Sequence, residues 1–294
     1  MEGVLDTLLI PFSYNYMFKA MWVSALVGGV CAFLSAYLML KGWSLMGDAL
    51  AHSIVPGVAA AYIIGAPFAV GAFFAGILAS AGMYFVKQKS RLREDAVIGL
   101  VFTALFALGL LMASIWPTSV SIQTIVLGNI LAIADEDVVQ VTIIAAVSLA
   151  VMLMIWKDLM VTFFDENHAR SIGINTTMLK IVFFALLSAC TVAALQTVGA
   201  CLVIAMVVTP GATAYLLTDR FGRLIIIAVA LGTTTSFVGA YISYFLDGAT
   251  GGVIVSLQTL LFLLAFYFAP KHGVLAARRR RLAVIGDALP GATR

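Results

Sequence analysis

Apolar blocks of about 20 residues, separated by short polar segments, run through the whole sequence. A helix of that length crosses a hydrocarbon core of about 30 Å, and lipid offers the backbone no water to bond, so helices are expected. Nine blocks can be marked, with the approximate bounds 17–40, 45–65, 67–87, 96–116, 138–156, 178–196, 198–218, 224–246 and 253–270. The second and third blocks are nearly continuous, as are the sixth and seventh, so a short block could be broken or re-entrant.

Composition indicates an integral membrane protein. The chain is 63% hydrophobic and 11% charged, with a mean hydropathy of +1.09. Soluble domains are about 45–50% apolar and about 25% charged, and could not cover this much apolar surface. We therefore expect one all-α domain over residues 1–294, a polytopic transmembrane helix bundle of eight to nine spans.

Lysine and arginine are distributed unevenly between the loops. They occur in 87–93, 157–180, 220–223 and 271–281, whereas 114–137 and 247–252 contain none. The positive-inside rule then places the N-terminus outside and the basic tail 271–294 in the cytoplasm, facing anionic lipid. Only Lys19 breaks the pattern. Because the charges lie in short loops between apolar blocks, the net charge of +3 predicts membrane topology and no nucleic-acid partner.

Asp48 is the acidic residue that lies inside an apolar block. A charge near the bilayer centre costs about 2.5–3.5 kcal/mol, so such a residue faces a cavity or a partner. His52 follows four residues later and therefore projects from the same helix face. A carboxylate with an imidazole suits Mn²⁺, Fe²⁺ or Zn²⁺, although helix capping by Asp48 and a structural hydrogen bond from His52 fit the spacing equally. Two ligands are too few for a metal, and a two-fold axis would supply a second pair.

Other features narrow the function classes. The sequence has no P-loop, no H-E-x-x-H and no G-x-S-x-G, so no catalytic site is expected and any ATP hydrolysis belongs to another subunit. His168 and His272 lie outside the blocks, where solvated side chains are expected. Pro210 predicts a break or kink in the seventh block.

Four segments resemble the metal-ion ABC permeases, the membrane subunits of bacterial manganese, zinc and iron(II) importers. The longest is KGWSLMGDALAHSIVPG at 41–57, similar to the second-helix signature of that family. The others are 127–131 in an outer loop, 164–175 in a cytoplasmic loop and 209–218 in the seventh block. The four segments occur in the order expected and span nearly the whole chain, and their residues resemble most those of the manganese and iron(II) branch of Gram-negative bacteria. Position 129 is Asn129 where relatives often carry Asp, so no charged role is transferred to it.

The resemblance implies a type II ABC importer permease of the bacterial inner membrane. It implies pairing with a second copy or with a sister permease, cytoplasmic ATP-binding subunits, and a periplasmic metal-binding protein. It also implies that Asp48 and His52 line the pathway as metal ligands, with no cofactor beyond the transported metal, which is manganese or iron(II) and possibly zinc.

The segment 162–176 resembles the coupling segment of the family, the part on which the ATPase acts. Its residues also predict a short helix outside the membrane. Asp165 and Glu166 lie where a helix N-terminus favours acids, Arg170 lies one turn later, and Gly173 ends the helix. With Ala169, these residues are the expected coupling residues.

The outer loop 114–137 is the expected docking surface for the binding protein. Apolar residues and the cluster Asp135, Glu136 and Asp137 provide contact area and charge there.

Three function classes stay open from the residues. The first is an ABC importer permease for a divalent metal, and the second is a stand-alone, proton-coupled metal transporter with Asp48 as the carrier. The third is a membrane scaffold or receptor without transport. The sequence does not decide the metal, nor whether the chain pairs with itself.

Overall fold

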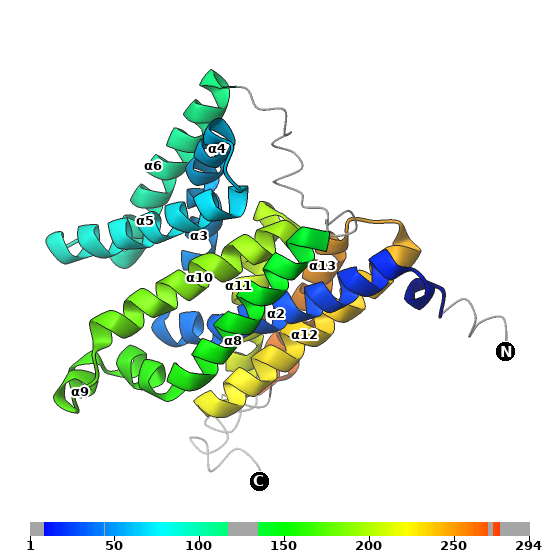
Figure 1. Ribbon diagram of the computed structural model, residues 1–294. Coiled ribbons are helices and arrows are strands. Elements are labelled where there is room, and N and C mark those ends of the chain that lie inside the picture. Colours follow the sequence, from blue (N-terminus) through cyan, green and yellow to red (C-terminus); the bar gives the residue numbers. More distant parts are fainter. Residues whose placement is uncertain (1–8, 44, 117–134, 270–272, 277–294) are drawn as a thin grey trace, which may run out of the picture.

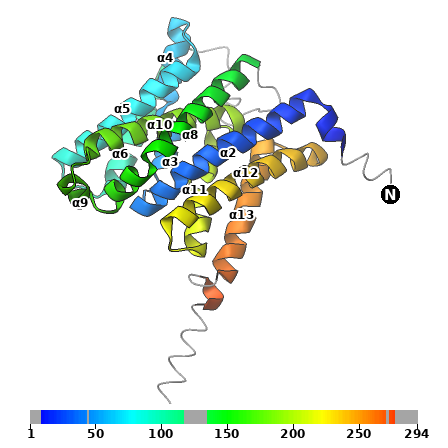
Figure 2. The same ribbon diagram turned by 60° about the horizontal axis from the view of Figure 1, so that its bottom comes forward.

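The computed structural model describes residues 9–43, 45–116, 135–269 and 273–276, which form helices joined by short turns (Figures 1 and 2). No strand occurs in these ranges, so the all-α prediction is confirmed. The helices are α2 (Asn15–Lys41), α3 (Met46–Ser53), α4 (Val55–Ile64), α5 (Phe68–Lys89), α6 (Glu94–Ile115), α8 (Asp135–Phe164), α9 (Glu166–Ser171), α10 (Thr176–Val198), α11 (Ala200–Leu217), α12 (Phe221–Leu246) and α13 (Thr250–Phe268).

Every predicted apolar block forms a helix. Within the described ranges, eight helical segments are long and apolar enough to cross a membrane, α3 and α4 being taken together. The block at α11 contributes a shorter apolar helix, Val203–Leu217. This agrees with the expected eight to nine spans.

Helix α2 forms the centre of the bundle and contacts α8, α10, α11 and α12 (Figure 1). Its side chains are buried on almost every turn between Met17 and Leu38. The contact with α12 is close because glycines face each other: a Cβ at Gly28 would lie 2.6 Å from the carbonyl oxygen of Gly232. Small residues of this kind let membrane helices approach each other, which stabilises them by van der Waals contact.

Helices α3 to α6 pack on one another and project beyond the α2 bundle in Figure 1. They are joined to the bundle through contacts of α5 with α10 and of α3 with α10 and α11. The predicted metal pair therefore lies on α3, one of the two helices that connect the two groups.

The second block is broken in its middle. Helix α3 ends at Ser53, and α4 begins at Val55 with Pro56 in its first turn, where the missing N–H of proline costs no hydrogen bond. On the far side of this break, α4 crosses α5 at two glycines. A Cβ at Gly57 would lie 2.1 Å from the carbonyl oxygen of Gly71, so the two backbones are in direct contact.

Pro210 was predicted to break or kink this block, and it does not break it: α11 continues from Ala200 to Leu217 with this proline inside it. A neighbouring helix forms hydrogen bonds with the backbone on either side of the proline. The Gly211 N–H donates to Ser35 Oγ of α2 at 3.0 Å, and the same hydroxyl donates to the Val208 carbonyl at 3.0 Å. Ser35 is fully buried, so its hydroxyl bonds the backbone of α11 beside the proline without competition from solvent.

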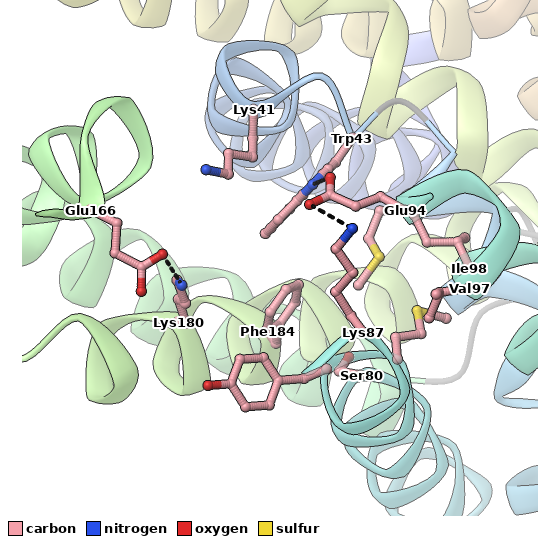
Figure 3. Close-up of a pocket in the computed structure, with 13 residues that line it drawn as sticks. Lys41, Trp43, Ser80, Lys87, Glu94, Val97, Ile98, Glu166, Lys180 and Phe184 are labelled. Carbon is pink, nitrogen blue, oxygen red and sulfur yellow. Dashed lines mark hydrogen bonds and ion pairs between the residues drawn. The ribbon is translucent and has the colours of Figure 1, made fainter. Parts of the chain in front are cut away.

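The basic residues of several helices gather at one end of the molecule. Lys41, Lys87 and Lys180 line one cavity there, although they come from α2, α5 and α10 (Figure 3). Lys19, the exception to the charge pattern, lies near the start of α2 and forms an ion pair with Asp135 at the start of α8. The exception is thus a cation that a local carboxylate neutralises.

Candidate functional site: the broken helix and the capped helix

The side chains of Asp48 and His52 meet on α3. His52 Nε2 lies 3.3 Å from Asp48 Oδ1, which confirms that the two residues project from one face. The Asp48 side chain is 33% exposed and the His52 side chain is 23% exposed, whereas the residues around them on α3 are buried. The pair therefore occupies the least buried face of this helix.

Asp48 does not cap α3. The residue at the N-cap position is Leu45, and no side chain forms a capping hydrogen bond there. Asp48 Oδ1 is shielded from solvent, and apart from the approach of His52 Nε2 at 3.3 Å, which forms no hydrogen bond, it has no partner among the described residues. A carboxylate oxygen without a donor is costly to keep in a low-dielectric environment, so this oxygen is available to a cation.

Helix α6 provides the wall opposite His52. The imidazole lies 5.6 Å from the ring of Phe102 and 5.3 Å from that of Phe106, measured between centroids. These phenylalanines are one turn apart and stack on each other. They pack against the imidazole and, being phenylalanines, offer its ring nitrogens no hydrogen-bonding group. The i, i+4 aromatic spacing was visible in the sequence, but nothing there linked it to His52.

The break after α3 is held on both sides by glycines. A Cβ at Gly109 of α6 would lie 2.8 Å from the Pro56 nitrogen, and one at Gly47 would lie 3.1 Å from Val207 Cγ1 of α11. Close packing at glycines thus surrounds the Asp48–His52 pair at three places: α4 against α5, α4 against α6, and α3 against a side chain of α11.

One chain supplies two potential metal ligands at this place. In the described ranges, no group of three or more His, Cys, Asp or Glu side chains could hold a metal ion. The ligand role of Asp48 and His52 thus stays a prediction, and it requires donors from a second subunit, from water, or from both.

The segment 162–176 contains the expected short helix, α9. Asp165 caps it: its carboxylate accepts hydrogen bonds from the backbone N–H groups of Asn167 and His168, both at 3.0 Å. The helix ends as expected, with Gly173 at φ 87° and the Ile174 N–H bonded to the Ala169 carbonyl. Ala169 is fully buried, and the exposed His168 agrees with the solvated side chain expected. His272 lies outside the described residues.

Glu166 connects α9 to α10. Its carboxylate lies 2.6 Å from Arg170 Nη2 and 2.6 Å from Lys180 Nζ, and Arg170 Nε donates to Thr176 Oγ1 at 3.2 Å. Partial burial raises the pKa of Glu166, but the hydrogen bonds and charges of Lys180 and Arg170 outweigh that effect and hold the pKa below its usual value. Glu166 is therefore ionised at neutral pH. Lys180 was read from the sequence only as a topology signal, and its role in holding α9 could not be found without the fold.

The predicted docking cluster begins α8. Asp135 pairs with Lys19, and Glu136 and Asp137 follow in the first turn, where the helix dipole favours acids. Most of the loop 114–137, including the motif at 127–131, lies outside the described residues, as does most of the basic tail.

Together, membrane-length helices, a broken span with a carboxylate and an imidazole on one face, and a capped helix beside the basic end define a polytopic membrane protein whose layout fits a subunit of a transporter. The chain belongs to the ABC 3 transport family, whose model matches residues 13–269. It is therefore the permease subunit of an ABC transport system, and its relatives do not favour a stand-alone transporter.

Relatives and a solved structure agree on this. The chain is 69% identical over 94% of its length to the chelated iron transport system membrane protein YfeC of Yersinia pestis, covering 94% of that protein. It is 47% identical over 93% of its length to the manganese transport system membrane protein MntB of a Synechocystis strain, covering 90% of it. The structure of PsaBC from Streptococcus pneumoniae in complex with Fab matches 95% of this chain and 100% of that chain, with 32% identity and a TM-score of 0.83.

Proposed function

We propose that this permease moves a divalent transition metal, manganese or iron(II), into the bacterial cytoplasm. The observation that carries the proposal is the Asp48 carboxylate, which has an oxygen without a donor in the described part of the chain and lies 3.3 Å from His52. The similar proteins of Yersinia and Synechocystis are named for iron and manganese transport, which supports these two metals over zinc.

The chemistry of the pair agrees with transient metal binding. One hard oxygen and one imidazole nitrogen suit manganese, iron(II) and zinc, and no thiolate is needed. Pairing of this chain with a second copy or a sister permease would bring two such faces together and provide four ligands. Conduction needs binding that is weak enough to release the ion, and partly exposed ligands on a short helix meet this need.

We infer that the Lys/Arg-rich end, with α9, faces the cytoplasm and that the N-terminus lies outside. In this orientation α9 contacts an ATPase subunit, and Asp135, Glu136 and Asp137 lie on the side from which a periplasmic binding protein delivers the metal. ATP hydrolysis on the partner then moves α9, and α10 follows because Glu166 binds Lys180.

The test is uptake of radioactive manganese and iron(II) by cells that carry the complete transport system. The uptake rate of the Asp48→Asn and His52→Gln variants should fall by at least about tenfold. Removing a residue that merely orients a metal ligand already lowers metal affinity or activity by about that factor. The control Asp95→Asn removes an exposed carboxylate from the first turn of α6 and should leave uptake unchanged. Uptake at the wild-type rate by both site variants, at equal membrane abundance, would exclude the ligand role.

A second measurement separates the importer from a proton-coupled carrier. Liposomes containing the permease alone should not accumulate metal under a proton gradient, whereas liposomes with the ATPase, the binding protein and ATP should. Accumulation by the permease alone would overturn the importer mechanism.

A further inference from the structure

A cavity of about 260 Å³ opens at the basic end of the bundle, between α5, α6 and α10 (Figure 3). Lys41, Lys87 and Lys180 line it, together with Glu94 and Glu166. Figure 3 shows the Lys180–Glu166 pair on one side and the Lys87–Glu94 pair on the other. This cavity is separate from the Asp48–His52 pair, and the proposed transport function assigns it no role.

The cations in and around the cavity exceed the anions. Glu166 is shared by Lys180 and Arg170, both at 2.6 Å. Glu94 lies 4.0 Å from Lys87 and also accepts a hydrogen bond from the Trp43 indole at 2.7 Å. Lys41 has no ion pair among the described residues; its ammonium lies 6.0 Å from the centroid of Trp43. Lys41 is thus available to an anion.

An apolar groove of about 410 Å³ adjoins the cavity between α5 and α10. The two share Ser80, Tyr84, Lys180 and Phe184 as lining residues. Farther along, the groove is lined by aliphatic and aromatic side chains: Ile77, Ala81, Phe85, Ile181 and Ala185. Phe85 and Ile181 are 61% and 64% exposed, so the groove faces outward from the bundle, between two helices that are long and apolar enough to cross a membrane.

The cationic cavity and the adjoining apolar groove together match the charged headgroup and the apolar acyl chain of one phospholipid molecule. Basic pockets between membrane helices at the cytoplasmic side recognise anionic headgroups. A free phosphate would use the lysines but leave the groove empty, whereas a zwitterionic lipid would bring a cation to three lysines. We propose that this end of the permease binds one anionic phospholipid, with its phosphate at Lys41 and Lys87 and an acyl chain in the groove between α5 and α10.

The site includes a residue that holds the coupling helix. Lys180 lines both the cavity and the groove and also binds Glu166 of α9. A lipid that occupies the cavity and the groove therefore lies next to the cation that holds α9. The proposal rests on the membrane location of the chain and on the orientation proposed above, and it does not depend on which metal is carried.

Native mass spectrometry of the purified transporter in mild detergent, with added phosphatidylglycerol, tests the site. The wild-type complex should retain one phosphatidylglycerol per permease chain, and the double variant K41Q/K87Q should bind it about tenfold more weakly or worse. The matched control K89Q/R91Q removes two charges from the same end without touching the cavity lining, and should bind as the wild type does.

Two further arms identify the ligand. Ala81→Trp fills the groove without changing charge and should also lose the lipid, while inorganic phosphate in excess should not displace it. Any of four results would overturn the proposal. These are loss of phosphatidylglycerol in K89Q/R91Q equal to that in K41Q/K87Q, retention of phosphatidylcholine equal to that of phosphatidylglycerol, displacement of the lipid by phosphate, and wild-type lipid binding by Ala81→Trp. A tryptophan at this lipid-facing position keeps the core intact, so this arm stays informative if the lysine variants fail to fold.

Discussion

The crossing of α4 and α5 leaves no room for a methyl group, so Gly71→Ala should separate the two helices. A Cβ at Gly71 would lie 2.2 Å from the Gly57 carbonyl oxygen and 2.7 Å from Ala61 Cβ. Both atoms are fixed by the backbone, and no side-chain rotation can move them. An ordinary carbon–oxygen contact is about 3.3 Å, so the helices must separate by about 1 Å.

Gly82 provides a matched control on the same helix. A Cβ there would lie 3.6 Å from Val101 Cγ1, an ordinary contact. Both substitutions gain the same helix propensity, up to about 1 kcal/mol, so it cancels when the two variants are compared. What is left is the overpacking at Gly71. We expect Gly71→Ala to be less stable than Gly82→Ala by about 1–3 kcal/mol.

The assay is reversible unfolding in mixed micelles with a denaturing detergent, followed by tryptophan fluorescence. Metal uptake is measured in parallel, because α4 joins the break beside His52 and its displacement should lower transport. Equal unfolding free energies for the two alanine variants would show that the crossing is looser than the backbone contact implies, and would refute the reasoning.

Two other predictions concern hydrogen bonds between helices. Ser35→Ala removes the acceptor of the Gly211 N–H beside the proline of α11 and should cost about 0.6–1.7 kcal/mol in the same micelles, with faster amide exchange at Gly211; unchanged exchange would contradict it. Glu166→Gln and Lys180→Met should each abolish the stimulation of the partner ATPase by metal delivery while the subunits still co-purify; stimulation at the wild-type level would contradict the link. Because the pKa of Glu166 is lowered in the fold, its stabilising contact is fully present above the usual carboxyl range and is lost only as pH falls through that lowered value. The stimulation of the ATPase in the wild type should therefore be flat from about pH 8 to pH 5.

Hydropathy predicted the helices because an apolar block that crosses lipid on its own can satisfy its backbone hydrogen bonds only as a helix. The breaks were harder to predict. Pro56 and Pro210 carry the same local signal, yet α4 starts at the first and α11 continues through the second. The difference is Ser35, which lies 175 residues earlier in the chain and supplies its hydroxyl to α11. No local pattern contains that information.

The same distinction between local and long-range contacts applies to the candidate site. The spacing of Asp48 and His52 predicted their common face, and acids before Gly173 predicted the capped helix, because both depend on neighbours within one turn. Residues that contribute from other elements were missed. Lys180 was interpreted only as a loop charge, and Phe102 was given no role, until the fold placed them against Glu166 and His52.

These contacts form a continuous route from the coupling helix to the predicted metal pair. Glu166 binds Lys180 at one end of α10, and farther along α10 the Ser188 hydroxyl donates to the Phe73 carbonyl of α5 at 3.2 Å. There α5 reaches the break itself, since a Cβ at Gly76 would lie 2.0 Å from Ser188 Oγ and 3.4 Å from Ile54 Cγ2.

A route of contacts establishes only that motion can be transmitted, and coupling has to be measured. Ser188→Ala removes the hydrogen bond in the middle of the route while leaving α9 and the Asp48–His52 pair untouched, so it should reduce metal uptake per ATP hydrolysed without preventing assembly. A wild-type ratio in this variant, together with a lowered ratio in Lys180→Met, would mean that α10 acts on α3 through their direct contact and that α5 is not part of the route.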